Sequence, residues 1–187
     1  MPKIIATKED WLNLGLICFA EEGLRALNVE KMAVTLNCNK SSFYWYFKNR
    51  TVFINNLLDH WVHVGTDEFM IEAGGTPAQE LERLLRLIFK DKRGRDFIFF
   101  LRQFACNNQR AKKILTQTEQ VRMNHLASLL ERMGLEIQLA NDLSIMLYHN
   151  YLGWYERHKY TEPSDKEVED QLRLIKKCFQ LPLSTTE

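Results

Sequence analysis

Apolar side chains recur at the spacing of an α-helix along almost the whole chain, and no segment alternates with the period of a β-strand. The first such stripe contains Leu12, Gly15, Leu16 and Phe19, at positions i, i+3, i+4 and i+7. A helix that is apolar along one stripe buries that stripe against other helices. The sequence therefore predicts an all-α fold with about nine helices.

Residues with capping chemistry mark the ends of the first three helices. Thr7 and Gly23 delimit the first, and Asn28 precedes a second that runs to about Leu36. Asn39 precedes a third over residues 40–47, since an Asn side chain can accept a hydrogen bond from a free N–H at a helix start.

Longer helices follow, at about residues 50–73, 76–90, 95–107, 110–133, 136–159 and 165–180, before a tail over 182–187. Thr76 with Gln79, and Ser164 with Glu167, have the spacing of a capping box. The first of these helices is expected to connect an N-terminal domain, residues 1–50, to a second helical domain, residues 51–187.

Composition excludes several classes of protein. The 187 residues are 45% apolar and 26% charged, as in ordinary globular domains. The longest apolar run, residues 97–101, is far below the roughly 18 residues that cross a bilayer, and the N-terminus lacks the apolar core of a secretory signal. The four cysteines form no C-x-x-C pair, which suits a reducing compartment. We expect a cytoplasmic protein with no membrane segment, bound metal or cofactor.

Positive charge is concentrated in one stretch. The whole chain carries a net charge of +1, but residues 25–50 contain five basic residues and one acid, Glu30, for a net charge of +4. The other 161 residues therefore sum to −3. A surface that binds a polyanion is expected in this stretch.

The same stretch has the pattern of a helix-turn-helix, two short helices joined by the turn Asn37-Cys38-Asn39 and preceded by a supporting helix. In its second helix, Phe43 and Phe47 lie four residues apart and can share the inward stripe. The remaining positions carry an ammonium, hydroxyls, phenols and an indole N–H, which can donate to phosphates and base edges. An aromatic cluster of this kind can also be plain core.

The order of these features resembles the DNA-binding domain of the TetR family of transcriptional regulators. The resemblance covers about 55 residues: a helix that ends in Phe-Ala-Glu-Glu-Gly at residues 19–23, the segment 29–33, and Tyr-Trp-Tyr-Phe-Lys-Asn-Arg at residues 44–50. Two segments depart from the family pattern. Residues 37–39 replace a common Gly-Val-Ser, and Ser41-Ser42 replaces Gly-Thr.

The resemblance implies a role for each matching residue. Asn28, Tyr46 and Arg50 would bind phosphates, Lys40, Ser41 and Tyr44 would reach base edges, and Trp45 would lie against the DNA backbone. The full set of expected DNA contacts is Asn28, Asn39, Lys40, Ser41, Ser42, Tyr44, Trp45, Tyr46, Lys48 and Arg50.

One such domain touches too few phosphates for tight binding, so we expect a homodimer on a palindromic operator, with half-site centres roughly 34 to 36 Å apart or a multiple of that spacing. The interface comes from the resemblance. The last two helices of each subunit would form a four-helix interface. Its candidate residues are Met146, Leu147, Asn150, Gly153, Trp154, Leu172, Ile175 and Phe179. Any one of them can instead belong to an internal core stripe.

A small-molecule effector is the third implied partner, in a pocket between the DNA-reading domain and the interface. The candidate walls are Trp61, Phe97, Phe100, Phe104, Met123 and Tyr148. The candidate polar anchors are Arg102, Asn107, His125 and His149. For each of these residues, plain core or surface is the competing interpretation.

The sequence thus predicts a DNA-binding transcriptional regulator, a repressor released from its operator by a ligand. One alternative is a helical adaptor that binds protein, which the low total charge favours and the local charge of +4 opposes. The other is an enzyme. Against an enzyme, the chain has no HExxH, Gly-rich phosphate loop or Gly-x-Ser-x-Gly motif, and His60 with His63, Asp59 and Asp67 could bind a metal only with help from another helix.

Overall fold

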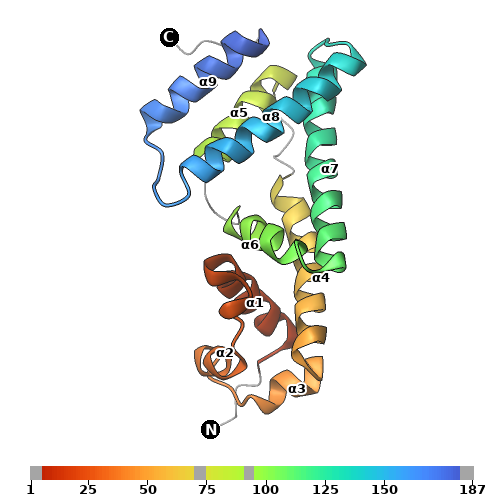
Figure 1. Cartoon of the computed structure of the whole chain (residues 1–187), viewed down its shortest axis with the longest axis vertical. Coiled ribbons are helices and arrows are strands. Elements are labelled where there is room, and N and C mark those ends of the chain that lie inside the picture. The colour runs from red at the N-terminus through yellow and green to blue at the C-terminus, as the bar shows by residue number, and fades with distance from the viewer. Residues whose placement is uncertain (1–5, 70–74, 91–94, 182–187) are drawn as a thin grey trace. The chain divides into compact units, whose positions relative to one another are not determined.

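The computed structural model describes residues 6–69, 75–90 and 95–181, except for the side chains of residues 65–69, 95 and 96. Within these ranges the chain contains no strand and one 3₁₀ turn, residues 23–25. The described residues form nine α-helices, labelled in Figure 1: α1 (Lys8–Glu22), α2 (Val29–Thr35), α3 (Ser41–Phe47), α4 (Arg50–Phe69), α5 (Pro77–Lys90), α6 (Arg95–Ala105), α7 (Gln109–Arg132), α8 (Ile137–Arg157) and α9 (Asp165–Phe179). The all-α prediction is confirmed. The predicted residues 70–73 of the fourth helix and the tail lie outside the described ranges.

The predicted caps account for the starts of α1, α5 and α9. The Thr7 hydroxyl accepts a hydrogen bond from an N–H in the first turn of α1. At α9 the Ser164 hydroxyl accepts from the Glu167 N–H (3.3 Å) and the Glu167 carboxylate accepts from the Ser164 N–H (2.8 Å). Hydrogen bonds from Ser164 lower the pKa of Glu167. Thr76 and Gln79 make the same reciprocal pair at α5.

The described chain forms two compact units. The first contains α1 to α4, α6 and α7 up to Thr118, and the second contains α5, the rest of α7, α8 and α9. The predicted boundary at residue 50 does not coincide with this division, because α3 and α4 share one aromatic core. The division of function between residues 1–50 and 51–187 stays a prediction.

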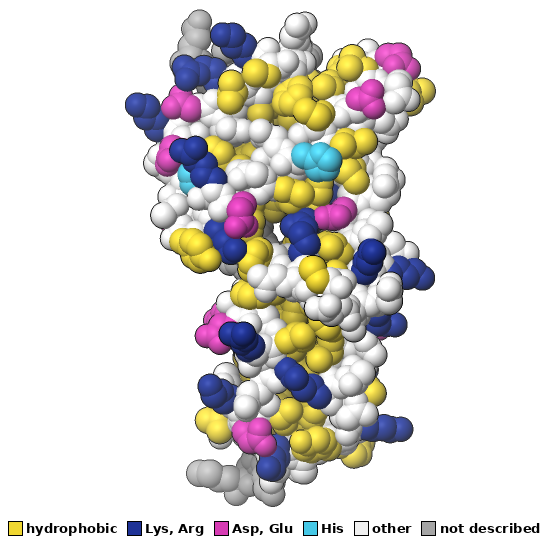
Figure 2. Space-filling model, in the orientation of Figure 1, with side chains coloured by type: hydrophobic (Ala, Val, Ile, Leu, Met, Phe, Trp, Pro, Cys, Tyr) yellow, Lys and Arg dark blue, Asp and Glu magenta, His cyan; other side chains and the backbone are white. Residues whose placement is uncertain are grey.

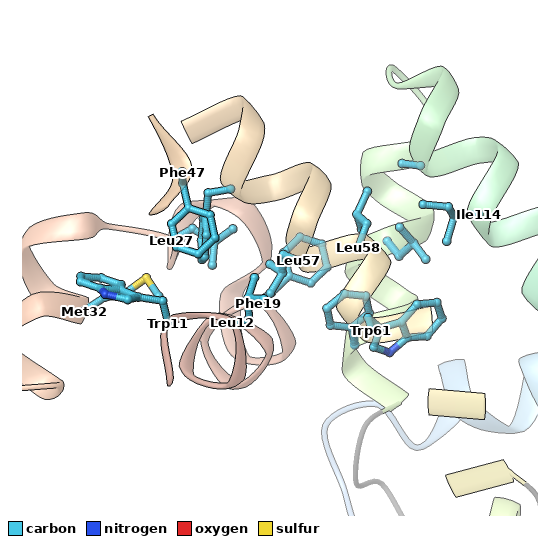
Figure 3. Close-up of a cluster of buried hydrophobic side chains, with 14 of the residues drawn as sticks. Trp11, Leu12, Phe19, Leu27, Met32, Phe47, Leu57, Leu58, Trp61 and Ile114 are labelled. Atoms are coloured by element: carbon cyan, nitrogen blue, oxygen red, sulfur yellow. The ribbon is translucent and has the colours of Figure 1, made fainter. Parts of the chain in front are cut away.

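Aromatic rings fill the core of the first unit, part of which is drawn in Figure 3. Phe43 and Phe47 of α3 pack against Phe53 of α4, with ring centroids 5.1 and 4.9 Å away. A Cβ added at Gly15 of α1 would lie 2.8 Å from the Phe53 ring. The absence of a side chain at residue 15 therefore lets α1 approach α4 closely.

Helix α6 packs against α1 in the same unit. The Phe97 ring lies 4.5 Å from Phe19 of α1 and stacks on Trp61 of α4 at 4.7 Å. At the end of α1, Gly23 has φ +65°, and a Cβ there would lie 2.7 Å from a ring carbon of Phe100. Glycine is thus required at residue 23 both by the backbone and by the contact with α6.

In the second unit, α5 packs against α8 and α9 through a buried apolar stripe that ends at Phe89. Ion pairs border this stripe. Glu80 pairs with Arg132 of α7 (2.8 Å), and Arg86 pairs with Glu169 of α9. The Arg132 guanidinium donates a hydrogen bond to the Glu80 carboxylate and lowers its pKa. Within the described ranges, none of the helices combines the length and the apolar character needed to cross a membrane.

Candidate nucleic-acid interface

Helices α2 and α3 and the turn between them have the predicted helix-turn-helix arrangement. The Asn28 side chain caps α2 by accepting from the Lys31 N–H (3.0 Å). Asn37 adopts a positive φ of 49°, the conformation for which an Asn in this turn is suited. The Cys38 N–H then donates back to the Ala33 carbonyl (3.0 Å), which closes the turn.

Helix α3 presents one face to the core and another to solvent. Phe43 and Phe47 are completely buried, whereas Tyr44 is 50% exposed and Trp45 is 78% exposed. Tyr46 is half-buried, with its ring centroid 4.8 Å from that of Trp45. The predicted outward surface of aromatic donors is therefore present, and Lys and Arg side chains are spread over the part of the molecule that α1 to α4 form (Figure 2).

One cation of this surface lies directly before α3. Lys40 is at the N-cap position, because α3 begins at Ser41, one residue later than predicted. Asn39 acts as a cap as predicted, because its side-chain oxygen accepts from the Ser41 N–H (2.9 Å). The Lys40 ammonium lies 3.6 Å from the carboxylate of Glu30, and both are exposed. Such a surface pair is weak, so the ammonium can be drawn to a phosphate or a base.

Ser42 is only partly exposed, and its role as a DNA contact stays a prediction. Its hydroxyl accepts a hydrogen bond from the indole N–H of Trp11 (3.2 Å) and donates to the Asn39 carbonyl (3.0 Å). Both bonds hold the hydroxyl within the unit. Ser41, its neighbour, is exposed as predicted.

Helix α3 ends at an unusual backbone conformation. Lys48 has φ +57°, and the Asn49 N–H donates to the Phe47 carbonyl (2.5 Å), so that Lys48 is the central residue of a γ-turn. The Lys48 side chain is exposed. The sequence interpretation missed the cap that follows, in which the Asn49 side chain accepts from the Val52 N–H (2.9 Å). Asn directly before Arg50 is a preferred N-cap residue and could have indicated this cap.

Arg50 begins α4, as predicted, and its side chain is exposed. One guanidinium nitrogen donates to the carbonyl of Leu24 (2.5 Å), which lies in the 3₁₀ turn after α1. A guanidinium has five donors, so this bond orients the side chain and is compatible with a phosphate contact.

The structure divides the predicted interface residues. Leu147, Leu172 and Ile175 are buried within the second unit, where they belong to its apolar interior. This corrects their assignment as interface residues. Met146 and Gly153 are exposed, while Asn150, Trp154 and Phe179 are partly buried. Asn150 accepts a hydrogen bond from Gln171 of α9 (2.8 Å), and the Trp154 indole donates to the Phe89 carbonyl (3.0 Å).

Three exposed apolar residues beside these positions were missed by the sequence interpretation. They are Leu139 and Ile145 of α8 and Leu174 of α9. Helical periodicity alone could have placed them opposite the core stripe of their helices.

The predicted pocket residues are distributed over both units. In the first, the rings of Phe97 and Phe100 lie against Phe19 and Trp61 stacks on Phe97. Phe104 is partly buried against this core, and Arg102 is also partly buried. In the second, Tyr148 is buried with its hydroxyl 3.4 Å from Glu119, and Met123 and His125 are partly buried. Asn107 and His149 are exposed, so neither lines the interior of its unit.

The proposed metal-binding alternative finds no support in the described side chains, among which no group of three or more His, Cys, Asp or Glu could hold a metal ion. Asp59 instead forms an ion pair with Arg110 (2.5 Å). His60 is within hydrogen-bonding distance of the Asn13 side chain (2.7 Å). Asp67 lies outside the described side chains.

Solved structures share this fold across nearly the whole chain. A transcriptional regulator from Rhodococcus sp. matches with a TM-score of 0.74 and 17% identity, covering 93% of this chain and 96% of the other. A TetR transcriptional regulator from Legionella pneumophila has a TM-score of 0.71 at 13% identity, with 95% and 99% of the chains covered. A regulator from Aquifex aeolicus has a TM-score of 0.66 at 19% identity, with 91% and 99% covered. Family models and curated proteins give no match to the sequence.

Proposed function

We propose that this chain, which has the fold of TetR-family transcriptional regulators, is itself a sequence-specific regulator that binds double-stranded DNA. The observation that carries the proposal is the division of α3, where buried Phe43 and Phe47 fix the helix while Tyr44 and Trp45 project outward. A major groove, roughly 12 Å wide, admits one helix with such a donor-bearing face.

The exposed residues divide into two chemical roles. Lys40, Ser41 and Tyr44 lie on the first turns of α3 or just before it, where they would reach base edges. Arg50, Lys48, Tyr46 and Asn28 would bind phosphates, with Trp45 against the sugar-phosphate backbone. Phosphate contacts set affinity and its salt dependence, and base contacts set sequence preference.

One α3 touches too few phosphates for tight binding, so the functional unit would be a homodimer on a palindromic operator. Met146 and Gly153, with the neighbouring exposed apolar residues of α8 and α9, supply a surface for a second copy. A small molecule bound by the helical part of the chain would release the DNA, and the regulator would then act as a repressor.

Selection of bound sites from random duplexes tests the proposal. We expect recovery of a palindrome, bound with an affinity that falls steeply with salt. Tyr46→Ala should abolish the mobility shift, while Tyr160→Ala, a change at a tyrosine that is 89% exposed beyond α8, should leave it unchanged. Salt-independent behaviour with no selected sequence would reject DNA binding and favour the adaptor.

The subunit interface is tested by charge insertion. Met146 of α8 and Val121 of α7 have similar exposed fractions, 55% and 58%. Met146→Asp should convert the dimer to a monomer in sedimentation experiments, and Val121→Asp should not, because only the first lies on the proposed surface. Equal behaviour of the two variants would contradict the interface.

A further inference from the structure

The first turn of α3 is joined to α1 by a directional hydrogen bond across 31 residues of sequence, from the Trp11 indole N–H to the Ser42 hydroxyl (3.2 Å). We propose that Trp11 is a positioning residue for DNA reading, which sets the orientation of α3 through Ser42 and so determines the sequence preference. The inference rests on the proposed DNA-binding function.

The bond belongs to a short relay that ends in the turn. Trp11 is completely buried, and its indole N–H is a donor with no acceptor capacity. The Ser42 hydroxyl accepts from it and donates to the Asn39 carbonyl (3.0 Å), with the Cys38 sulfur 3.7 Å away. Hydrogen bonds in series polarise one another, so the relay is stronger than its separate bonds.

The other contacts of α3 lie at its start and on its core face. The helix has only seven residues; Lys40 at its N-cap position provides no side-chain cap, and the Asn39 side chain accepts from the Ser41 N–H. Phe43 and Phe47 attach it to the core through apolar contacts, which are not directional. The Trp11 ring adds an edge-to-face contact with Phe43, at a centroid distance of 5.2 Å. The relay therefore adds a directional hydrogen bond between α1 and α3 to these ring contacts.

Base reading is more sensitive to such a rotation than phosphate binding. Contacts with base edges tolerate only about 0.5 Å or 10–20° of displacement. Long basic side chains can follow a phosphate over larger distances. Ser41 and Tyr44 lie on either side of Ser42 and Phe43 in α3, so rotation of the helix displaces both of them. Loss of the relay should lower preference for the operator and leave general DNA affinity in place.

Four variants test this role. Trp11→Phe keeps a ring against Phe43 and removes the indole N–H, and Ser42→Ala removes the hydroxyl. Ser42→Thr retains a hydroxyl and serves as the conservative variant. The matched control is Ser144→Ala, because the buried Ser144 hydroxyl of α8 also donates to the carbonyl three residues earlier (2.8 Å).

The readout is the ratio of affinities for the selected operator and for a random duplex, measured by fluorescence anisotropy at one salt concentration. Trp11→Phe and Ser42→Ala should each lower the ratio about tenfold, the discrimination typical of one base contact. Affinity for the random duplex should not change. The double variant should lose no more than either single variant, because the two changes break one relay. Ser42→Thr and Ser144→Ala should retain the full ratio.

Equal losses on both duplexes, or a reduced ratio for Ser144→Ala, would overturn the positioning role and leave Trp11 as a core residue. A DNA-free measurement separates this result from failure of the proposed function. The indole proton resonance of Trp11 should move upfield in Ser42→Ala and keep its position in Ser42→Thr. If the chemical shift of that resonance is the same in both variants as in the wild type, the relay does not exist. A wild-type chain that binds no duplex would overturn both proposals.

Discussion

Gly23→Ala should be among the most destabilising single-methyl additions that the chain can receive. Residue 23 has φ +65° and ψ −144°, a combination that essentially only glycine adopts. Forcing a side chain into such a conformation costs about 1–3 kcal/mol. The new Cβ would also lie 2.7 Å from Phe100, and overpacking of this kind costs about 1–3 kcal/mol more. Reduced freedom of the unfolded chain offsets about 0.4–1 kcal/mol, which leaves a net loss of about 3 kcal/mol.

Gly134→Ala separates the two contributions. Gly134 lies in the turn after α7 with φ +94°, but a Cβ added there would meet nothing within 4 Å. Only the backbone cost applies, so its loss should be smaller than that of Gly23→Ala by about 1–3 kcal/mol. Combining Gly23→Ala with Phe100→Ala should recover that difference in a double-mutant cycle.

Thermal unfolding followed by circular dichroism measures these changes, at one fixed protein concentration because the melting temperature of a dimer depends on it. For a chain of this size, each kcal/mol lowers the melting temperature by about 2–4 °C. A Gly23→Ala variant that melts no lower than Gly134→Ala would refute the argument from the contact between α6 and the end of α1.

Three further predictions concern charged residues. Glu30→Gln frees the ammonium of Lys40 and removes the one acid in the basic stretch, so affinity for every duplex should rise by up to about fivefold at low salt, and unchanged anisotropy titrations would contradict it. Lys48→Gly should have a free energy of unfolding about 1–3 kcal/mol higher than Lys48→Ala, because glycine accepts φ +57°. Both variants should lose DNA affinity equally. Equal melting temperatures of the two variants would show that the γ-turn is unstrained. Arg132 holds the pKa of Glu80 below its ordinary value of 4.5, so this pair stabilises the folded state above that pH and the contribution is lost as the pH falls through the lowered pKa. Between about pH 5 and pH 3 the melting temperature of Glu80→Gln should therefore fall less than that of the wild type, and parallel curves would exclude the pair as a source of acid sensitivity.

Features that depend on neighbouring residues could be predicted from the sequence. The capping pair Ser164 and Glu167 satisfies its own hydrogen bonds within four residues, so the residue types identify the helix start. The same holds for the inward positions Phe43 and Phe47, whose spacing of four defines one helical face. In these cases the residue types within one or two helical turns were sufficient to predict the structure.

Features that depend on distant residues could not be predicted in the same way. The inward orientation of Ser42 depends on Trp11, 31 residues earlier, and a serine on a helix carries no signal for it. Leu147 and Ile175 lie on apolar stripes, but periodicity cannot tell whether a stripe packs within its own subunit or against another. The positive φ of Lys48 is unexpected too, because lysine, unlike glycine or asparagine, does not indicate a γ-turn.

The alternation of inward and outward residues along α3 also defines how the protein could be retargeted. A library meant to recognise new operators should randomise Lys40, Ser41 and Tyr44, whose side chains are exposed and proposed to reach base edges. Ser42 should stay fixed together with Trp11, because diversity at that position would mix altered recognition with a misaligned helix. Directed evolution that treats the two adjacent serines as equivalent would spend much of its diversity on clones that bind DNA indiscriminately.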